Sequence, residues 1–303
     1  MINYLELVKK SFQIAFKHKY LWIFGLFAGY GITTTSLNFS SSTNYDITSQ
    51  DPQAQKFFQA INDYLTINWT VVLYLLIFIV FIAFLVYFAS ILSQSALVLS
   101  IRDIEDNKKV HFWFSLHRAK SRFWALLWYK IVIFFIYLFI ILGTSSPLLV
   151  FLVTQQWILS ILYGLILFFF ILFIFIVLNL SARYGLRFVV LKKITGFKAL
   201  LYGWRFLKQF YKEVLILWLL QFAIGLGAAI ITLIFILCIG LLSLGLGFAF
   251  YSIWGLLTAL IYGGVIVLLA IVCLAIWSAF LSTFNWTIPT LLFLKLQAKL
   301  SKQ

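Results

Sequence analysis

Three long stretches of the sequence contain no Asp, Glu, Lys or Arg. They cover residues 64–101, 131–182 and 214–294 and are 38, 52 and 81 residues long. A charged side chain at the centre of a lipid bilayer costs roughly 2.5–3.5 kcal/mol on insertion scales. A transmembrane helix needs about 20 apolar residues and satisfies its own backbone hydrogen bonds. The uncharged stretches therefore predict helices that cross a membrane.

The composition also indicates a membrane protein rather than a soluble one. The 303 residues are 64% hydrophobic and 10% charged, whereas an average soluble domain is about 25% charged. A water-soluble fold of this length could not bury so much apolar surface. We predict an all-α, polytopic membrane protein that forms a single membrane domain with six transmembrane helices. The expected helices cover residues 20–36, 69–92, 124–143, 157–180, 214–239 and 256–281.

The cations lie almost entirely in alternate connections between the expected helices. Of the 23 Lys and Arg residues, 21 fall before the first helix, after the second, after the fourth or after the sixth, and Lys130 lies near the inner end of the third. The exception is Lys56, which lies among Asp46, Asp51 and Asp63. Because retained cations mark the cytoplasmic face, both termini are expected in the cytoplasm. The net charge of +15 is explained by this topology, so it does not indicate a nucleic-acid partner.

The 81-residue stretch could hold two, three or four helices by length alone. Three helices would place Lys295, Lys299 and Lys302 outside the cell, and four would need a further turn that the sequence does not show. Two helices fit best, with an apolar outer hairpin near residues 240–255. That hairpin could be re-entrant or interfacial.

The chain repeats one pattern three times, at residues 1–107, 108–194 and 195–303. Each unit begins with a basic amphipathic segment and continues with a helix, an outer turn and a second helix. One helical hairpin cannot bury its own interface, so a pseudo-threefold or sequentially packed bundle is expected. The basic segments are expected in the inner membrane interface, in contact with anionic headgroups. The cations predicted to make this contact are Lys9, Lys10, Arg118, Arg122, Arg205 and Lys208.

The segment KHKYLWIFGLFAG at residues 17–29 follows a basic amphipathic start and precedes further hairpins of the same build. In this respect the chain resembles bacterial six-span membrane protein families of uncharacterised function. It also resembles the membrane domain attached to some glycerophosphodiester phosphodiesterases. The resemblance implies a multi-pass protein of the bacterial cytoplasmic membrane. It implies no activity, because the 303 residues contain no soluble phosphodiesterase domain.

No constellation of residues indicates an enzyme, a cofactor or a metal site. The three histidines, His18, His111 and His117, are all expected on the cytoplasmic side, and the last two do not share a helical face. The acidic cluster Asp103, Glu105 and Asp106 is interpreted as a solvated turn of mixed charge, with a divalent-cation site as the alternative. We therefore expect no catalytic, cofactor-binding or metal-ligating residues.

Polar residues near the inner ends of the expected helices are candidates for a transport path. They would surround a vestibule open to the cytoplasm, although Lys130 could snorkel to the interface and the others could tie helices together. The candidate vestibule residues are Ser90, Gln94, Lys130, Asn179 and Asn285. In the first helix, Gly25 and Gly29 form a GxxxG motif, which predicts close helix packing, with a hinge or a dimer seam as the alternative.

Two functional hypotheses follow. The first is a non-enzymatic scaffold or accessory protein whose basic helices bind the anionic inner leaflet, and which has room for a protein partner or a second copy. The alternative is a transporter or lipid-handling protein with a cytoplasm-facing vestibule between the repeats. A roomy cavity lined by the candidate polar residues would favour the alternative, and tight packing around them would favour the first hypothesis.

Overall fold

The computed structural model describes residues 3–29, 69–108, 110–153, 157–254 and 256–300. Within these ranges the protein is all-α, with helices and no strand. The helices are α1 (Tyr4–Lys17), α2 (Leu21–Gly29), α4 (Trp69–Glu105), α5 (Phe112–Lys120), α6 (Phe123–Val153), α7 (Trp157–Lys192), α8 (Gly196–Gln209), α9 (Tyr211–Trp254) and α10 (Leu256–Leu300).

Five of these helices, α4, α6, α7, α9 and α10, are long and apolar enough to cross a membrane. The chain is therefore a multi-pass membrane protein. Each of the five begins within three residues of the start predicted from the charge pattern. The other expected span, 20–36, is described only as far as Gly29 in α2, and its remainder lies outside the described residues.

The helices extend well past the ends that the charge pattern predicted. The predicted outer hairpin at 240–255 is wrong in extent, because α9 remains helical as far as Trp254 and α10 begins at Leu256. An uncharged apolar segment has no polar competitor for its backbone hydrogen bonds, so the helix continues until the chain reverses. Gly240 and Gly245 do not interrupt it.

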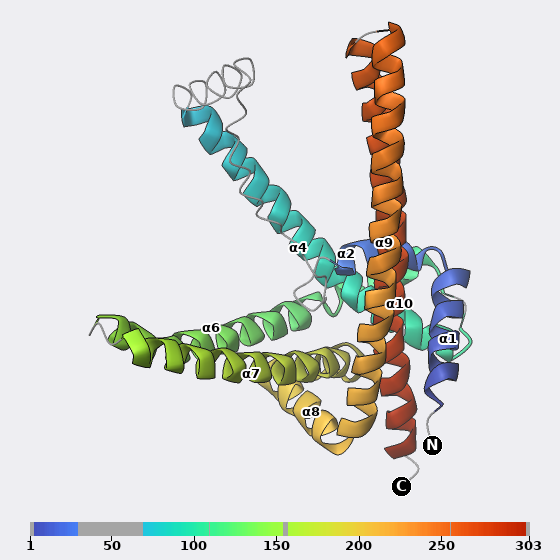
Figure 1. Cartoon of the computed structure of the whole chain (residues 1–303). Helices are drawn as coiled ribbons and strands as arrows, with labels where there is room; N and C mark the ends of the chain where they lie inside the picture. The colour runs from blue at the N-terminus through green and yellow to red at the C-terminus, as the bar shows by residue number, and fades with distance from the viewer. Residues whose placement is uncertain (1–2, 30–68, 109, 154–156, 255, 301–303) are drawn as a thin grey trace.

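The long helices pair and then diverge from one common core. Helix α6 packs on α7, α9 packs on α10, and α2 lies against both α4 and α10. Figure 1 shows the α6–α7 and α9–α10 pairs and helix α4 pointing away from the core in different directions. Buried residues concentrate where these elements meet, at 90–101 of α4, 180–190 of α7 and 282–296 of α10. We call these three segments the inner core.

The three short helices α1, α5 and α8 pack in a regular order. Helix α1 lies along α10, α5 along α4 and α8 along α7. In α8 the side facing α7 uses small residues such as Ala199 and Gly203, together with Leu200 and Phe206. The bulky residues Phe197, Leu201 and Trp204 remain exposed beside it. Helix α8 therefore presents one face to the protein and a separate aromatic face to its surroundings.

Glycines allow the closest of these helix contacts. A Cβ atom at Gly25 would overlap the Thr283 hydroxyl and the Ala279 carbonyl of α10, and Gly29 lies against Ser282 of the same helix. The close packing predicted from the GxxxG motif is therefore confirmed. Between α7 and α8, a Cβ atom at Gly203 would overlap the backbone of Ser181 and Gly185. Small residues at these positions let the backbones approach each other.

Candidate functional site

Hydroxyl groups on α4, α7 and α10 connect the hairpins to the helices beside them. The Ser95 Oγ donates to the Ala119 carbonyl of α5 at 3.5 Å, and the Ser181 Oγ donates to the Leu200 carbonyl of α8 at 3.3 Å. The Thr283 Oγ1 donates to the Leu21 carbonyl at the start of α2 at 3.1 Å. All three donors lie in the inner core. Hydrogen bonds of this kind hold helices together in a medium without water.

The structure brings three of the five candidate vestibule residues to facing positions on α4 and α6. Ser90 and Gln94 are fully buried on α4, and the Gln94 Nε2 donates to the Ser90 Oγ at 3.1 Å. Lys130 of α6 is 8% exposed, and its Nζ lies 5.8 Å from the ring centroid of Tyr87, which precedes Ser90 by one turn. Ser90 and Gln94 thus contact each other, and Lys130 lies over the ring of Tyr87, which is on the same helix as these two residues.

The other two candidates occupy different surroundings. Asn179 is half-buried on α7, and Asn285 is exposed on α10. Pro289, one turn after Asn285, has no N–H to offer the Asn285 carbonyl. Gln221 of α9 supplies the missing donor, with its Nε2 at 3.0 Å from that carbonyl oxygen. Asn285 thus marks a contact between α9 and α10.

Several buried polar atoms of the candidate residues have no hydrogen-bond partner within the described part of the chain. They are the Gln94 Oε1, the Lys130 Nζ and the Asn179 Oδ1, and the Ser282 Oγ shares this property. An unsatisfied polar atom is costly in a low-dielectric core, and such atoms often mark functional positions. Of these atoms, the Gln94 Oε1 and the Ser282 Oγ lie within the inner core, and the Lys130 Nζ and the Asn179 Oδ1 lie beside it on α6 and α7.

Two apolar cavities lie outside this group of atoms. One, of about 330 Å³, lies between α7 and α8 and is lined by Phe173, Ile174, Val177, Leu178, Ser181, Leu200, Leu201 and Trp204. The other, of about 590 Å³, lies between the α1–α2 segment and the α9–α10 hairpin. We call the second one the aromatic cavity. Its lining residues are Phe12, Phe16, Trp22, Ile231, Thr232, Phe235, Cys273, Leu274, Ile276, Trp277 and Phe280. Neither lining includes a candidate vestibule residue.

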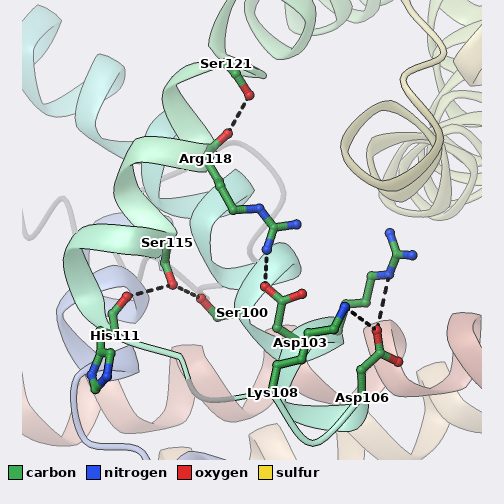
Figure 2. A network of polar contacts seen from close by, with 9 residues as sticks. Ser100, Asp103, Asp106, Lys108, His111, Ser115, Arg118 and Ser121 are labelled. Carbon is green, nitrogen blue, oxygen red and sulfur yellow. Dashed lines mark hydrogen bonds and ion pairs between the residues drawn. The ribbon is translucent and has the colours of Figure 1, made fainter.

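The acidic cluster at the end of α4 is engaged in ion pairs (Figure 2). Buried Asp103 pairs with Arg118 of α5, and Glu105 pairs with Lys10 of α1 at 2.8 Å. Asp106 lies 3.6 Å from the Lys108 Nζ and 3.9 Å from the Arg102 Nε. Each carboxylate therefore meets a cation, as the mixed-charge interpretation predicted. The solvated turn is wrong for Asp103, which lies inside α4 and is buried because it packs and pairs against α5. Among the described residues, no three His, Cys, Asp or Glu side chains are grouped so that they could hold a metal ion.

A pair of serines continues this network between α4 and α5. The Ser100 Oγ donates to the Ser115 Oγ at 2.8 Å, and the Ser115 Oγ donates to the His111 carbonyl at 3.2 Å. Figure 2 shows both contacts beside the Asp103–Arg118 pair. The end of α4, α5 and α1 are thereby joined into one charged and hydrogen-bonded assembly. His111 takes part in this network through its backbone carbonyl, so its place beside the serines requires no role for the imidazole.

The six cations predicted to contact headgroups fall into two groups. Lys9, Arg205 and Lys208 are exposed, and Arg122 is half-buried. Lys10 and Arg118 are instead paired with the carboxylates described above. The exposed members lie at the surface of α1 and α8, where an external anion can reach them.

Arg187 of α7 is a feature that the sequence did not single out. It is 1% exposed, its Nε donates to the Thr290 Oγ1 of α10 at 3.1 Å, and its Nη1 donates to the Arg183 carbonyl at 2.5 Å. The guanidinium lies 5.6 Å from the Tyr184 ring centroid and 5.8 Å from that of Trp286. In the sequence, Arg187 is one of several cations after the fourth expected helix, and the charge pattern places all of them in the cytoplasm. Its apolar neighbours in the sequence were the only sign of burial.

The short connection between α1 and α2 brings charge close to the aromatic cavity. Lys17 and Lys19 are exposed there and flank His18. Partial burial, and secondarily the neighbouring Lys17, hold the pKa of His18 below its usual range. Lys17 and Lys19 are the Lys side chains of this connection, and both are exposed.

The chain matches no protein-family model, no curated protein and no solved structure. Its function must therefore be argued from the inner core, the ion-pair assembly and the two cavities.

Proposed function

We propose that this multi-pass protein is a non-enzymatic scaffold or accessory protein of the bacterial cytoplasmic membrane. In this proposal it has six spans, both termini lie in the cytoplasm, and basic helices contact the anionic inner leaflet. The observation that carries the proposal is the packing around the candidate vestibule. Ser90 and Gln94 are fully buried and bonded to each other, and the cavities lie elsewhere.

The order of helix contacts supports three repeated units. Each short helix packs on the second long helix of a different unit: α5 on α4, α8 on α7 and α1 on α10. The last of these contacts joins the two ends of the chain and closes the series into a ring. In such a ring each unit contacts both of its neighbours. The units are therefore held in fixed positions relative to one another, as a rigid scaffold requires.

Accessibility of the inner core tests the scaffold proposal. In a background with Cys238 and Cys273 replaced by Ser, we expect Gln94→Cys to resist a hydrophilic maleimide applied from the cytoplasmic side. Lys208→Cys, which is exposed on α8, is the matched control and must react. Reaction of Gln94→Cys at a similar rate would show an open vestibule and overturn the proposal.

The unpartnered atoms of Gln94, Lys130 and Asn179 favour a second candidate function, transport or lipid handling through the inner core. A substrate with polar groups would satisfy these atoms on binding. In this case Lys130→Met would abolish substrate movement in reconstituted vesicles. In a scaffold the same variant would be neutral or stabilising, because it removes a buried unpaired cation.

A further inference from the structure

The aromatic cavity offers an apolar ligand a continuous hydrophobic wall. Phe280 of α10 lies at its centre, with its ring centroid 5.4 Å from that of Phe12, 5.8 Å from that of Trp22 and 6.0 Å from that of Trp277. Helices α1, α2 and α10 therefore meet around a single ring. The volume of about 590 Å³ lies within the usual range for ligand sites, which is about 300–1,000 Å³.

The polar atoms of this wall are already satisfied within the protein. The Trp22 Nε1 donates to the Ala15 carbonyl at 2.7 Å, and the Trp277 Nε1 donates to the Thr232 Oγ1 at 3.0 Å. The Thr232 hydroxyl itself donates to the Ala228 carbonyl at 2.8 Å. These groups leave little hydrogen-bonding capacity for a ligand. A hydrocarbon chain fits such a wall, whereas a sugar, nucleotide or peptide would lose its hydrogen bonds to water there.

The cavity lining extends along helix α10. It reaches from Phe280 to Cys273, which is about 10 Å at 1.5 Å per residue. One leaflet of the hydrocarbon core is about 15 Å deep. The Cys273 end lies within the uncharged stretch of α10, and the Phe12–Phe16 end adjoins the basic connection between α1 and α2.

Two cationic side chains belong to the connection that adjoins the Phe12–Phe16 end of the cavity. Lys17 and Lys19 are exposed, and neither has an ion-pair partner within the described ranges. The cavity lining contains no carboxylate. An apolar channel along the helices with a cationic mouth matches a molecule that has a hydrocarbon chain and an anionic head.

We propose that the aromatic cavity binds one acyl chain of an anionic phospholipid, with the phosphate held by Lys17 and Lys19. The bilayer presents such molecules at the depth and with the orientation that the cavity requires. This site goes beyond the scaffold proposal and does not depend on it, because the cavity is separate from the candidate vestibule.

Native mass spectrometry of the delipidated full chain tests the site, with phosphatidylglycerol and phosphatidylcholine of identical chains as probes. We expect one phosphatidylglycerol to be retained in preference to phosphatidylcholine. Replacing Lys17 and Lys19 by Gln should weaken phosphatidylglycerol binding by about fivefold for each lysine, while phosphatidylcholine binding stays unchanged. Replacing the exposed Lys198 of α8 by Gln removes one positive charge away from the cavity. This variant should bind phosphatidylglycerol and phosphatidylcholine as the unmodified protein does.

A substitution that fills the cavity tests the site independently of the two lysines. Cys273→Trp places a bulky ring in the lining, and displacing as few as two CH₂ groups of the chain would weaken binding by about tenfold. Cys238→Trp adds the same ring to the same hairpin outside the lining, so it should bind as the unmodified protein does. Equal retention by the two Trp variants, or equal affinity of the unmodified protein for the two lipids, would overturn the proposal. The Gln94→Cys result has no bearing on either outcome.

Discussion

At the scale of single residues, Pro289 deprives the Asn285 carbonyl of its helical donor, and Gln221 replaces that donor from the neighbouring helix. We expect Gln221→Leu to destabilise the protein by about 1 kcal/mol, because the Asn285 carbonyl loses this hydrogen bond. Unfolding in mixed detergent micelles would measure the change. Phe222→Leu, at the next position, is the control and should change stability little. No loss with Gln221→Leu would mean that the bond contributes nothing.

Arg187 leads to a second prediction at this scale. Its planar group bonds Thr290 and a backbone carbonyl while lying over two rings, and an ammonium group cannot reproduce that geometry. Arg187→Lys should therefore cost about 2 kcal/mol of stability. Arg205→Lys is the matched control, since Arg205 also lies over a tyrosine ring but is exposed. Thermal unfolding in detergent would show a clear loss only for the first variant, and equal effects would contradict the role given to Arg187.

At the scale of elements, the contact between α7 and α8 depends on small residues. A methyl group at Gly203 would press on the backbone of Ser181 and Gly185, which a side-chain rotation cannot relieve. We expect Gly203→Ala to destabilise the protein by about 1–3 kcal/mol. At Gly227 of α9 the same methyl group would meet open space, so Gly227→Ala should be neutral or slightly stabilising. Both variants add one methyl group and differ only in the surroundings of that group. Similar unfolding curves would show that α8 is only loosely packed on α7.

The elements also show what the sequence could and could not predict. Lipid excludes charge, so the ends of the charge-free stretches located the starts of α4, α6 and α9 to within about eight residues, whereas α7 and α10 begin inside such stretches. The same stretches say nothing about where a helix stops in water, and α4 continues from the expected end at 92 as far as Glu105. The pairing of Asp103 with Arg118 and the burial of Arg187 depend on which helices meet, which spacing along one chain does not reveal.

At the scale of the whole molecule, the hairpins diverge from the inner core (Figure 1). Helices that cross a bilayer tilt by about 0–40° from its normal. In a membrane we therefore expect the outer ends of the α6–α7 and α9–α10 hairpins to turn about the inner core until they emerge on the same side. Their lipid-facing surfaces are already apolar, so this change of angle exposes no polar group. The inner core and its ion pairs would stay on the opposite side, with the basic connections.

This arrangement fixes which positions water can reach from each side. Helix α9 is about 66 Å long for its 44 residues, about twice the roughly 30 Å hydrocarbon core, so Ser243 should lie beyond the outer boundary. In a background without native cysteines, Ser146→Cys and Ser243→Cys should react with an impermeant maleimide added to intact cells. Lys193→Cys, at the basic end of α7, should react only after the membrane is opened. Labelling of Lys193→Cys in intact cells would show that this end of α7 lies outside the cell. The inner core and the basic end of the aromatic cavity would then also lie on the outer side.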